Sequence, residues 1–224
     1  VSGNELWPPF FSKYSKTLSK SEINFLNNKF NKLEKNIKIK DFLQAQKELE
    51  EILIKEPDHA YANFLMGKIN IRLNKIDISW NYFEKAIDED GFPIRSVSKI
   101  NNLLKKQSEL NNSNVSYINF PKVMRKITSY NYPNQALFED WVHPSILSHI
   151  IIGRLSSCEI IKYIKIESDK KFSFCNKFKD YSNFETLYDD YRQKFKISEE
   201  NVIQDRKKIY RWLILVSRIS AHPE

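Results

Sequence analysis

Long apolar runs are absent from this sequence of 224 residues, and that absence limits what the chain can be. No stretch of about 18 or more consecutive apolar residues occurs, so the sequence predicts no membrane-spanning helix. The apolar stretch 146–155 is interrupted by His149, Gly153 and Arg154. Hydrophobic residues still make up 41% of the chain, which is enough for one large or two small domains with a core. We therefore expect a globular protein rather than a disordered one.

Cysteine is also scarce, because Cys158 and Cys175 are the only two in the chain. They do not form a close pair, and no histidine stands at a metal-ligand spacing from them. The sequence therefore argues against a disulfide framework and against a zinc site. The two thiols could still form one bridge across a loop in an oxidising compartment. We expect no metal and no other cofactor.

Basic residues outnumber acidic ones, and the formal net charge is +8. A cluster of lysine and arginine on one face would indicate binding to nucleic acid or to an anionic surface. The lysines are instead spread among asparagine, isoleucine and glutamate, and acidic residues alternate with them in residues 48–56. This pattern favours a solvated basic surface, so we expect no nucleic-acid partner.

Residues 21–88 show the apolar spacing of helices, with Gly67 and Pro57 as exceptions. A shift of 34 residues aligns Phe42 with Ile76, Ala45 with Ser79, Leu49 with Phe83 and Ile52 with Ala86. This register is that of tetratricopeptide repeats. Residues 58–86 form the better unit and keep Gly67 where two helices approach closely, whereas the preceding unit is degenerate. Because stacked repeats need about three units for a continuous core, we interpret this region as an insert that leans on another domain.

The pattern changes after the Gly-Phe-Pro sequence that follows the repeats. Residues 94–110 are predicted to form an amphipathic helix, residues 115–120 alternate like a short strand, and residues 121–127 are again helical. Helix, turn and strand make half of an α/β unit. The predicted fold class is therefore mostly α with a partial α/β element. The apolar face of the first of these helices carries Ile100, Leu103 and Leu104.

Asp140 and His143 are the most informative pair in the sequence, and a helix is predicted to follow them from Ser145. An aspartate three residues ahead of a histidine on a tight loop can direct its carboxylate to Nδ1 of the imidazole. That contact fixes the tautomer and leaves Nε2 to take a proton from a serine. Pro144 at the first helical turn would hold the loop. The alternative is a surface histidine beside an aspartate, which is a common arrangement.

Two short runs resemble conserved blocks of the SGNH (GDSL) serine hydrolases. The run 138–144, Phe-x-Asp-x-x-His-Pro, resembles the last block, in which Asp and His complete the catalytic triad. The run 2–6, Ser-Gly-Asn-Glu-Leu, is similar to the Gly-x-Asn-Asp/Glu block, although Ser2 stands where glycine is usual. The resemblance implies an incomplete three-layer α/β core and implies that Asn4 donates its amide to the oxyanion. The alternative for Asn4 is an ordinary Asn-Glu turn.

A third resemblance lies at the end of the helical insert. The run 86–95 is similar to an Asp-x-x-Pro-x-Arg junction in family members that carry tetratricopeptide inserts. Arg95 is thus a candidate for contact with an anionic substrate group, because its guanidinium presents a planar fork of donors. The alternatives are that Arg95 caps a helix or pairs with Asp88.

The sequence contains no match to the nucleophile motif of the family. No Gly-Asp-Ser or Gly-Gly-Ser turn follows a strand, and no glycine-bearing second block occurs. The chain begins at Val1 without a methionine, and its first residues read as the exit of a strand. We therefore expect the serine to lie upstream, together with any signal peptide or anchor. This chain alone would then be inactive.

The predicted organisation has four parts. Residues 1–20 hold the oxyanion block, 21–92 the tetratricopeptide-like insert, 93–160 the C-terminal part of the hydrolase core, and 161–224 a helical extension. The resemblance implies an ester hydrolase or acyltransferase that acts on a small-molecule or glycan acyl ester. The alternative is a protein–protein interaction module whose helical repeats bind a partner. The compartment stays open, although anchored or exported relatives slightly favour an extracytoplasmic parent.

Overall fold

The computed structural model describes residues 7–38, 40–110, 115–127, 137–140 and 142–163, and the isolated residues 175, 193, 194, 196, 198 and 200. These residues contain seven α-helices and no β-strand, which confirms the mostly α class. The helices are α1 (Lys20–Lys38), α2 (Phe42–Lys55), α3 (Ala60–Arg72), α4 (Ile76–Asp88), α5 (Ser98–Leu110), α6 (Phe120–Ile127) and α7 (Ile146–Tyr163). None of them is both long and apolar enough to cross a membrane.

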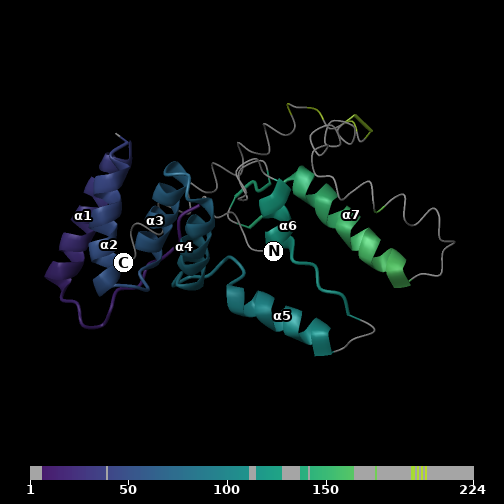
Figure 1. The fold of residues 1–224 in the computed structure, drawn as a ribbon, viewed down its shortest axis with the longest axis horizontal. Helices are drawn as coiled ribbons and strands as arrows, with labels where there is room; N and C mark the ends of the chain where they lie inside the picture. The colour runs from purple at the N-terminus through teal and green to yellow at the C-terminus, as the bar shows by residue number, and fades with distance from the viewer. Residues whose placement is uncertain are drawn as a thin grey trace.

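The first four helices pack in sequence order, α1 on α2, α2 on α3, and α3 on α4 (Figure 1). They share one core, which includes Leu33 of α1, Leu49 of α2, Leu65 of α3 and Phe83 of α4. All four side chains are almost completely buried. Each of these helices therefore contributes an apolar face to a common interior, as the helical periodicity predicted.

Two of these helices approach closely at Gly67 in α3. A Cβ atom added there would lie 2.8 Å from the ring of Phe83 in α4. Phe83 is only 1% exposed, so its ring has no room to withdraw. The close approach that the sequence predicted at Gly67 is therefore present, and any side chain at this position would push the helices apart.

The ends of the helices follow local capping rules. Asp41 begins α2 by accepting a hydrogen bond from the backbone N–H of Gln44. His59 begins α3 in the same way, because its Nδ1 accepts from Ala62 N at 3.1 Å. Asn74, with φ of 58°, occupies the left-handed region between α3 and α4, a conformation that asparagine tolerates better than most residues. These caps explain why the hairpins turn where they do.

The segment before α1 runs back to the end of α4 and is tied there by Asp90. The carboxylate of Asp90 accepts hydrogen bonds from the backbone N–H groups of Phe10, at 2.8 Å, and Phe11, at 2.9 Å. Gly91 N donates to Phe11 O at 2.7 Å. Residues about eighty positions apart in sequence are thereby joined, and the N-terminal segment crosses the helical hairpins to this junction (Figure 1).

A second, smaller core joins α6 and α7. Met124 of α6 and Ile151 of α7 pack with Leu137 and Phe138, which lie in the segment between the two helices. Ser148 is completely buried at the same place, and its hydroxyl donates to Leu137 O at 2.5 Å. The guanidinium of Arg125 in α6 lies over the ring of Trp80 in α4, 3.3 Å from the ring centroid. This stacking contact links the second core to the helical hairpins.

The strand predicted for residues 115–120 is wrong. Residues 115–119 have no regular secondary structure, and Phe120 already belongs to α6. A strand needs a neighbour to pair its backbone N–H and C=O groups, and the described residues contain none. Asn119 instead caps α6, because its side-chain oxygen accepts from Lys122 N at 3.0 Å.

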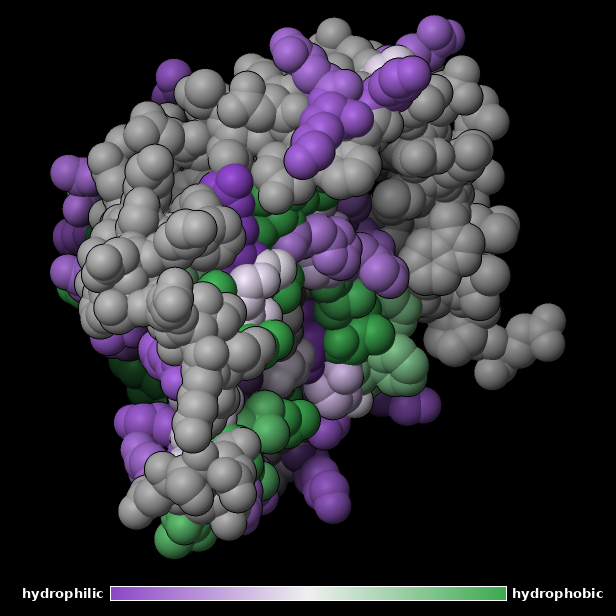
Figure 2. Space-filling model, turned by 90° about the vertical axis from the view of Figure 1, so that its right-hand side faces the viewer, coloured by the Kyte–Doolittle hydropathy of each residue, from purple (hydrophilic) through white to green (hydrophobic). Residues whose placement is uncertain are grey.

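The helix predicted for residues 94–110 is present but begins later, at Ser98. The Asp88 carboxylate accepts hydrogen bonds from Ser98 N at 2.7 Å and Ser98 Oγ at 2.5 Å, and these bonds define the start of α5. The predicted apolar face of α5 is only partly covered, since Ile100, Leu103 and Leu104 are about half exposed. Apolar side chains also reach the surface between hydrophilic ones on the face shown in Figure 2.

The two cysteines form a disulfide, Cys158–Cys175, with a Cα–Cα distance of 5.8 Å. The single bridge that the sequence left open is therefore the arrangement found here. The helical extension predicted for residues 161–224 falls almost entirely outside the described residues. The three-layer α/β core implied by the SGNH resemblance stays a prediction.

Candidate active site

The candidate site is built around the buried carboxylate of Asp140, whose side chain is 5% exposed. Its oxygen Oδ1 accepts hydrogen bonds from the backbone N–H groups of Val142 and His143, both at 2.8 Å. Its oxygen Oδ2 lies 2.6 Å from Nδ1 of the His143 ring. The backbone bonds hold the carboxylate still, so its second oxygen is directed at the imidazole.

The loop that carries the pair is closed at its base. Phe138 and Pro144 form an isolated bridge, and Glu139 N donates to His143 O at 2.9 Å. Ser145 N donates to Leu137 O at 2.8 Å. Because Leu137 and Phe138 are only 1% exposed, the second core anchors the loop. The tight loop and the carboxylate–imidazole contact predicted from the Asp-x-x-His spacing are therefore present.

His143 itself faces outward, with 70% of its side chain exposed. A neutral imidazole that donates from Nδ1 to a carboxylate has an unprotonated Nε2, which is the form that can act as a base. No described residue forms a hydrogen bond or ion pair with Nε2 of His143. The ring is therefore oriented from one side by Asp140 and available on the other. The catalytic role of the pair stays a prediction.

Arg95 lies in a different environment from the one predicted for a substrate contact. Its side chain is 2% exposed, and its guanidinium donates to Trp7 O at 2.8 Å and Pro8 O at 3.4 Å. It also pairs with Asp90, with 3.5 Å between Nη2 and Oδ2. Arg95 therefore pairs with an aspartate, as in one of the two alternatives, but the aspartate is Asp90 rather than Asp88. We therefore assign Arg95 to the junction that holds the N-terminal segment and propose no substrate contact for it.

Asn4, the predicted oxyanion donor, lies outside the described residues, as do all of residues 1–6. Its relation to His143 is therefore still a prediction. Within the described part of the chain, no group of three or more His, Cys, Asp or Glu side chains is placed to hold a metal ion.

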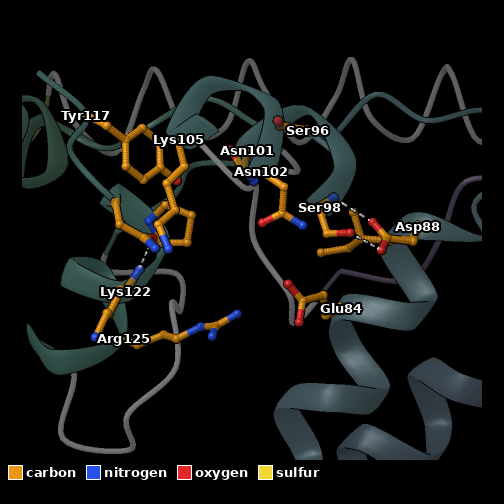
Figure 3. A pocket seen from close by; sticks show the side chains of 13 residues that line it. Glu84, Asp88, Ser96, Ser98, Asn101, Asn102, Lys105, Tyr117, Lys122 and Arg125 are labelled. Carbon is orange, nitrogen blue, oxygen red and sulfur yellow. Dashed lines mark hydrogen bonds between the residues drawn. The ribbon is translucent and has the colours of Figure 1, made fainter. Parts of the chain in front are cut away.

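A polar cavity of about 330 Å³ lies between the end of α4, α5 and α6 (Figure 3). Glu84 and Asp88 line one side, and Arg125 reaches across from α6 toward the side of Glu84. Asp88 is already engaged by Ser98. The residues that line this cavity do not include Asp140 or His143. The cavity and the aspartate–histidine pair are therefore separate features.

The aromatic surroundings of His59 could not be predicted from the sequence, because no neighbouring residue in the sequence indicates a partner for this histidine. The side chain is 2% exposed and lies between the rings of Tyr14 and Phe30, with centroid distances of 4.8 Å to both. The only sequence signal is its place directly before α3, after Pro57 and Asp58, where a capping residue is expected.

No family model, no curated protein and no solved structure matches this chain.

Proposed function

We propose that this chain supplies the histidine and aspartate of a serine hydrolase or acyltransferase that acts on oxygen esters. The observation that carries the proposal is the contact between Asp140 Oδ2 and His143 Nδ1 at 2.6 Å, together with the 70% exposure of the imidazole. A buried carboxylate behind an exposed imidazole is the arrangement that a general base requires. The nucleophilic serine would come from outside this sequence.

In the proposed reaction, Nε2 of His143 removes the proton from the serine hydroxyl as the serine oxygen attacks the ester carbonyl. The carboxylate of Asp140 stabilises the imidazolium that forms and keeps its ring in place. His143 then returns the proton to the departing alcohol, which leaves the acyl group bonded to the serine. His143 next removes a proton from a water or an acceptor alcohol as it attacks the acyl-serine, and it returns that proton to the serine oxygen when the acyl group is released. General acid–base transfer of this kind contributes about 10²- to 10⁴-fold in rate. Asn4 would donate its side-chain amide to the negative charge that develops on the carbonyl oxygen.

The family resemblance supports the hydrolase proposal because residues of the run 138–144 that match the family pattern also shape the loop. Phe138 anchors the loop in the second core, and Pro144 closes the loop opposite it. Asp140 and His143 make the contact that the family's mechanism needs. The pattern thus corresponds to a defined loop rather than to an accidental spacing on a helix. The ester preference rests on the resemblance alone.

A second candidate function is binding of a protein partner by the helical hairpins. One observation favours it, because three large apolar side chains of α1 and α2 are exposed, namely Phe25 at 67%, Leu43 at 72% and Ile54 at 81%. A bound partner would remove this apolar surface from water, which is favourable. The hydrolase test below separates the two functions, since an adaptor would have no esterase activity to lose.

The test measures hydrolysis of a chromogenic short-chain ester by the full protein that the gene encodes. We expect His143→Ala to lower kcat/KM by about 10³-fold or more, because the base is removed. His149→Ala is the matched control, since His149 is another exposed histidine of the same region and makes no contact with Asp140. We expect it to keep wild-type activity. Full activity of His143→Ala, with an unchanged circular dichroism spectrum, would refute the proposed role.

A further inference from the structure

The geometry points to a second site, a binding pocket for a small organic ammonium ion, between the segment before α1, α1 itself and the start of α3. The pocket has a volume of about 440 Å³. Aromatic rings of Tyr14, Phe30, His59 and Tyr61 line it, and Glu34 contributes a carboxylate. Its lining does not include Asp140 or His143, so the inference is independent of the hydrolase proposal.

The aromatic wall of the pocket is continuous. The ring of His59 stacks on Phe30 with an interplanar angle of 26° and a centroid distance of 4.8 Å. Tyr14 contacts the same histidine, and Tyr61 meets Phe30 edge-on at 5.6 Å. The faces of phenyl and phenol rings carry negative potential and attract cations, which is how quaternary ammonium groups are recognised. Phe30 and His59 are buried and stacked on each other, so they form the base of the pocket. Tyr14 and Tyr61 are only half-buried, and they are the rings that can contact an ammonium group in the pocket.

The charge of the pocket also favours a cation. Among the described residues that line the pocket, Glu34 is the only acidic one, and none is lysine or arginine. His59 adds no positive charge at neutral pH, because burial lowers its pKa to about 4. The carboxylate of Glu34 therefore gives the described lining a formal negative charge, which attracts a cation at short range.

Hydrogen bonds hold the polar groups of the pocket in place. The hydroxyl of Tyr61 donates to Oε1 of Glu34, and burial raises the pKa of Tyr61, so the phenol remains a donor. The hydroxyl of Tyr14 donates to the side-chain oxygen of Asn27 at 2.5 Å. Both phenol rings are thus fixed before a ligand arrives, which reduces the conformational entropy lost on binding.

Isothermal titration calorimetry of the full chain tests the site. It compares the affinity for choline with the affinity for 3,3-dimethylbutan-1-ol, a neutral molecule of the same shape. We expect choline to bind at least about tenfold more tightly, because only the cation gains from the rings and from Glu34. Tetramethylammonium should also bind. Equal affinity for the neutral molecule, or no binding of either cation, would overturn the proposal.

Two pairs of variants locate the site. Glu34→Gln should weaken choline binding about fivefold or more, whereas Glu50→Gln removes an equal charge from the exposed face of α2 and should leave the affinity unchanged. Tyr14→Leu should weaken binding, whereas Tyr14→Phe keeps the ring and should retain it. Thermal unfolding of each variant verifies that it is folded. Unchanged affinity in both Glu34→Gln and Tyr14→Leu would refute this location.

Discussion

At the scale of single residues, the carboxylate of Asp140 performs two tasks with its two oxygens. Oδ1 holds the backbone of the loop through Val142 and His143, and Oδ2 orients the imidazole. The two tasks can be separated by substitution, because an asparagine keeps an oxygen for the backbone N–H groups but presents an NH₂ group to the ring. The loop would then survive while the imidazole loses its acceptor.

Asp140→Asn is therefore expected to change the tautomer of His143. The amide NH₂ would donate to Nδ1, so the ring would carry its proton on Nε2 and could no longer act as a base. Two-dimensional ¹⁵N–¹H spectra of the imidazole distinguish the two tautomers, and the Nε2–H form should become the major one. Esterase activity should fall with it, by somewhat less than in His143→Ala. Retention of the Nδ1–H form would contradict the proposed role of Asp140.

At the scale of helices, the hairpins are defined by close packing as much as by helical propensity. Gly67 allows α3 to approach α4, and the Phe83 ring occupies the space that a side chain would need. Gly153 in α7 differs, because a Cβ added there meets nothing within 4 Å. Two helical glycines thus have opposite structural meanings, one required by a contact and one not.

Gly67→Ala should lower the free energy of unfolding by about 1–3 kcal/mol, because the added methyl group would lie too close to the buried ring of Phe83. Gly153→Ala is the matched control and should stabilise the protein by about 0.5–1 kcal/mol, because alanine loses less backbone entropy in a helix. Urea denaturation followed by circular dichroism measures both. A neutral or stabilising Gly67→Ala would show that α3 and α4 are not packed as described.

At the scale of the whole molecule, a few distant contacts hold the parts together. Asp90 and Arg95 fasten the N-terminal segment to the end of α4, and the stacking of Arg125 on Trp80 joins the two cores. His59 belongs to this scale as well, because its ring packs between the N-terminal segment and α1. Its Nε2 is buried and forms no hydrogen bond with the described residues, so no hydrogen bond there stabilises a protonated Nε2.

The stability of the molecule should therefore fall as the pH drops from about 6.5 to about 4. Burial lowers the folded-state pKa of His59 from 6.5 to about 4, so the unfolded chain binds a proton in this range while the folded protein does not. The effect is at most about 3 kcal/mol. Chemical denaturation at several pH values measures it. His59→Asn, which can still cap α3 but does not titrate, should lose less stability over the same range.

If wild type and His59→Asn lose stability in parallel between these pH values, the histidine is hydrated rather than buried. The carboxylates titrate in both proteins, so their contribution cancels in the comparison. The difference between the two curves is therefore the quantity of interest. This difference should be constant above pH 7, where His59 is neutral in both the folded and the unfolded states, and it should change only at lower pH.

Features that depend on near neighbours could be predicted from the order of the residues. Apolar spacing predicted the helices of the hairpins, the repeat register predicted the close approach at Gly67, and the Asp-x-x-His spacing predicted the contact between Asp140 and His143. Each of these features arises from residues a few positions apart or from a regular helical period. Such interactions can be predicted from the order of residues in the sequence.

Features that join distant segments became apparent only from the folded structure. Residues 115–120 alternate like a strand but lack a described partner strand. The guanidinium of Arg95 bonds to backbone carbonyls almost ninety positions away rather than facing a substrate. The pocket around His59 gathers the segment before α1, α1 and the start of α3. These features could not be predicted because burial and long-range pairing depend on which surfaces come into contact in the fold. The spacing of residues along the chain does not specify those contacts.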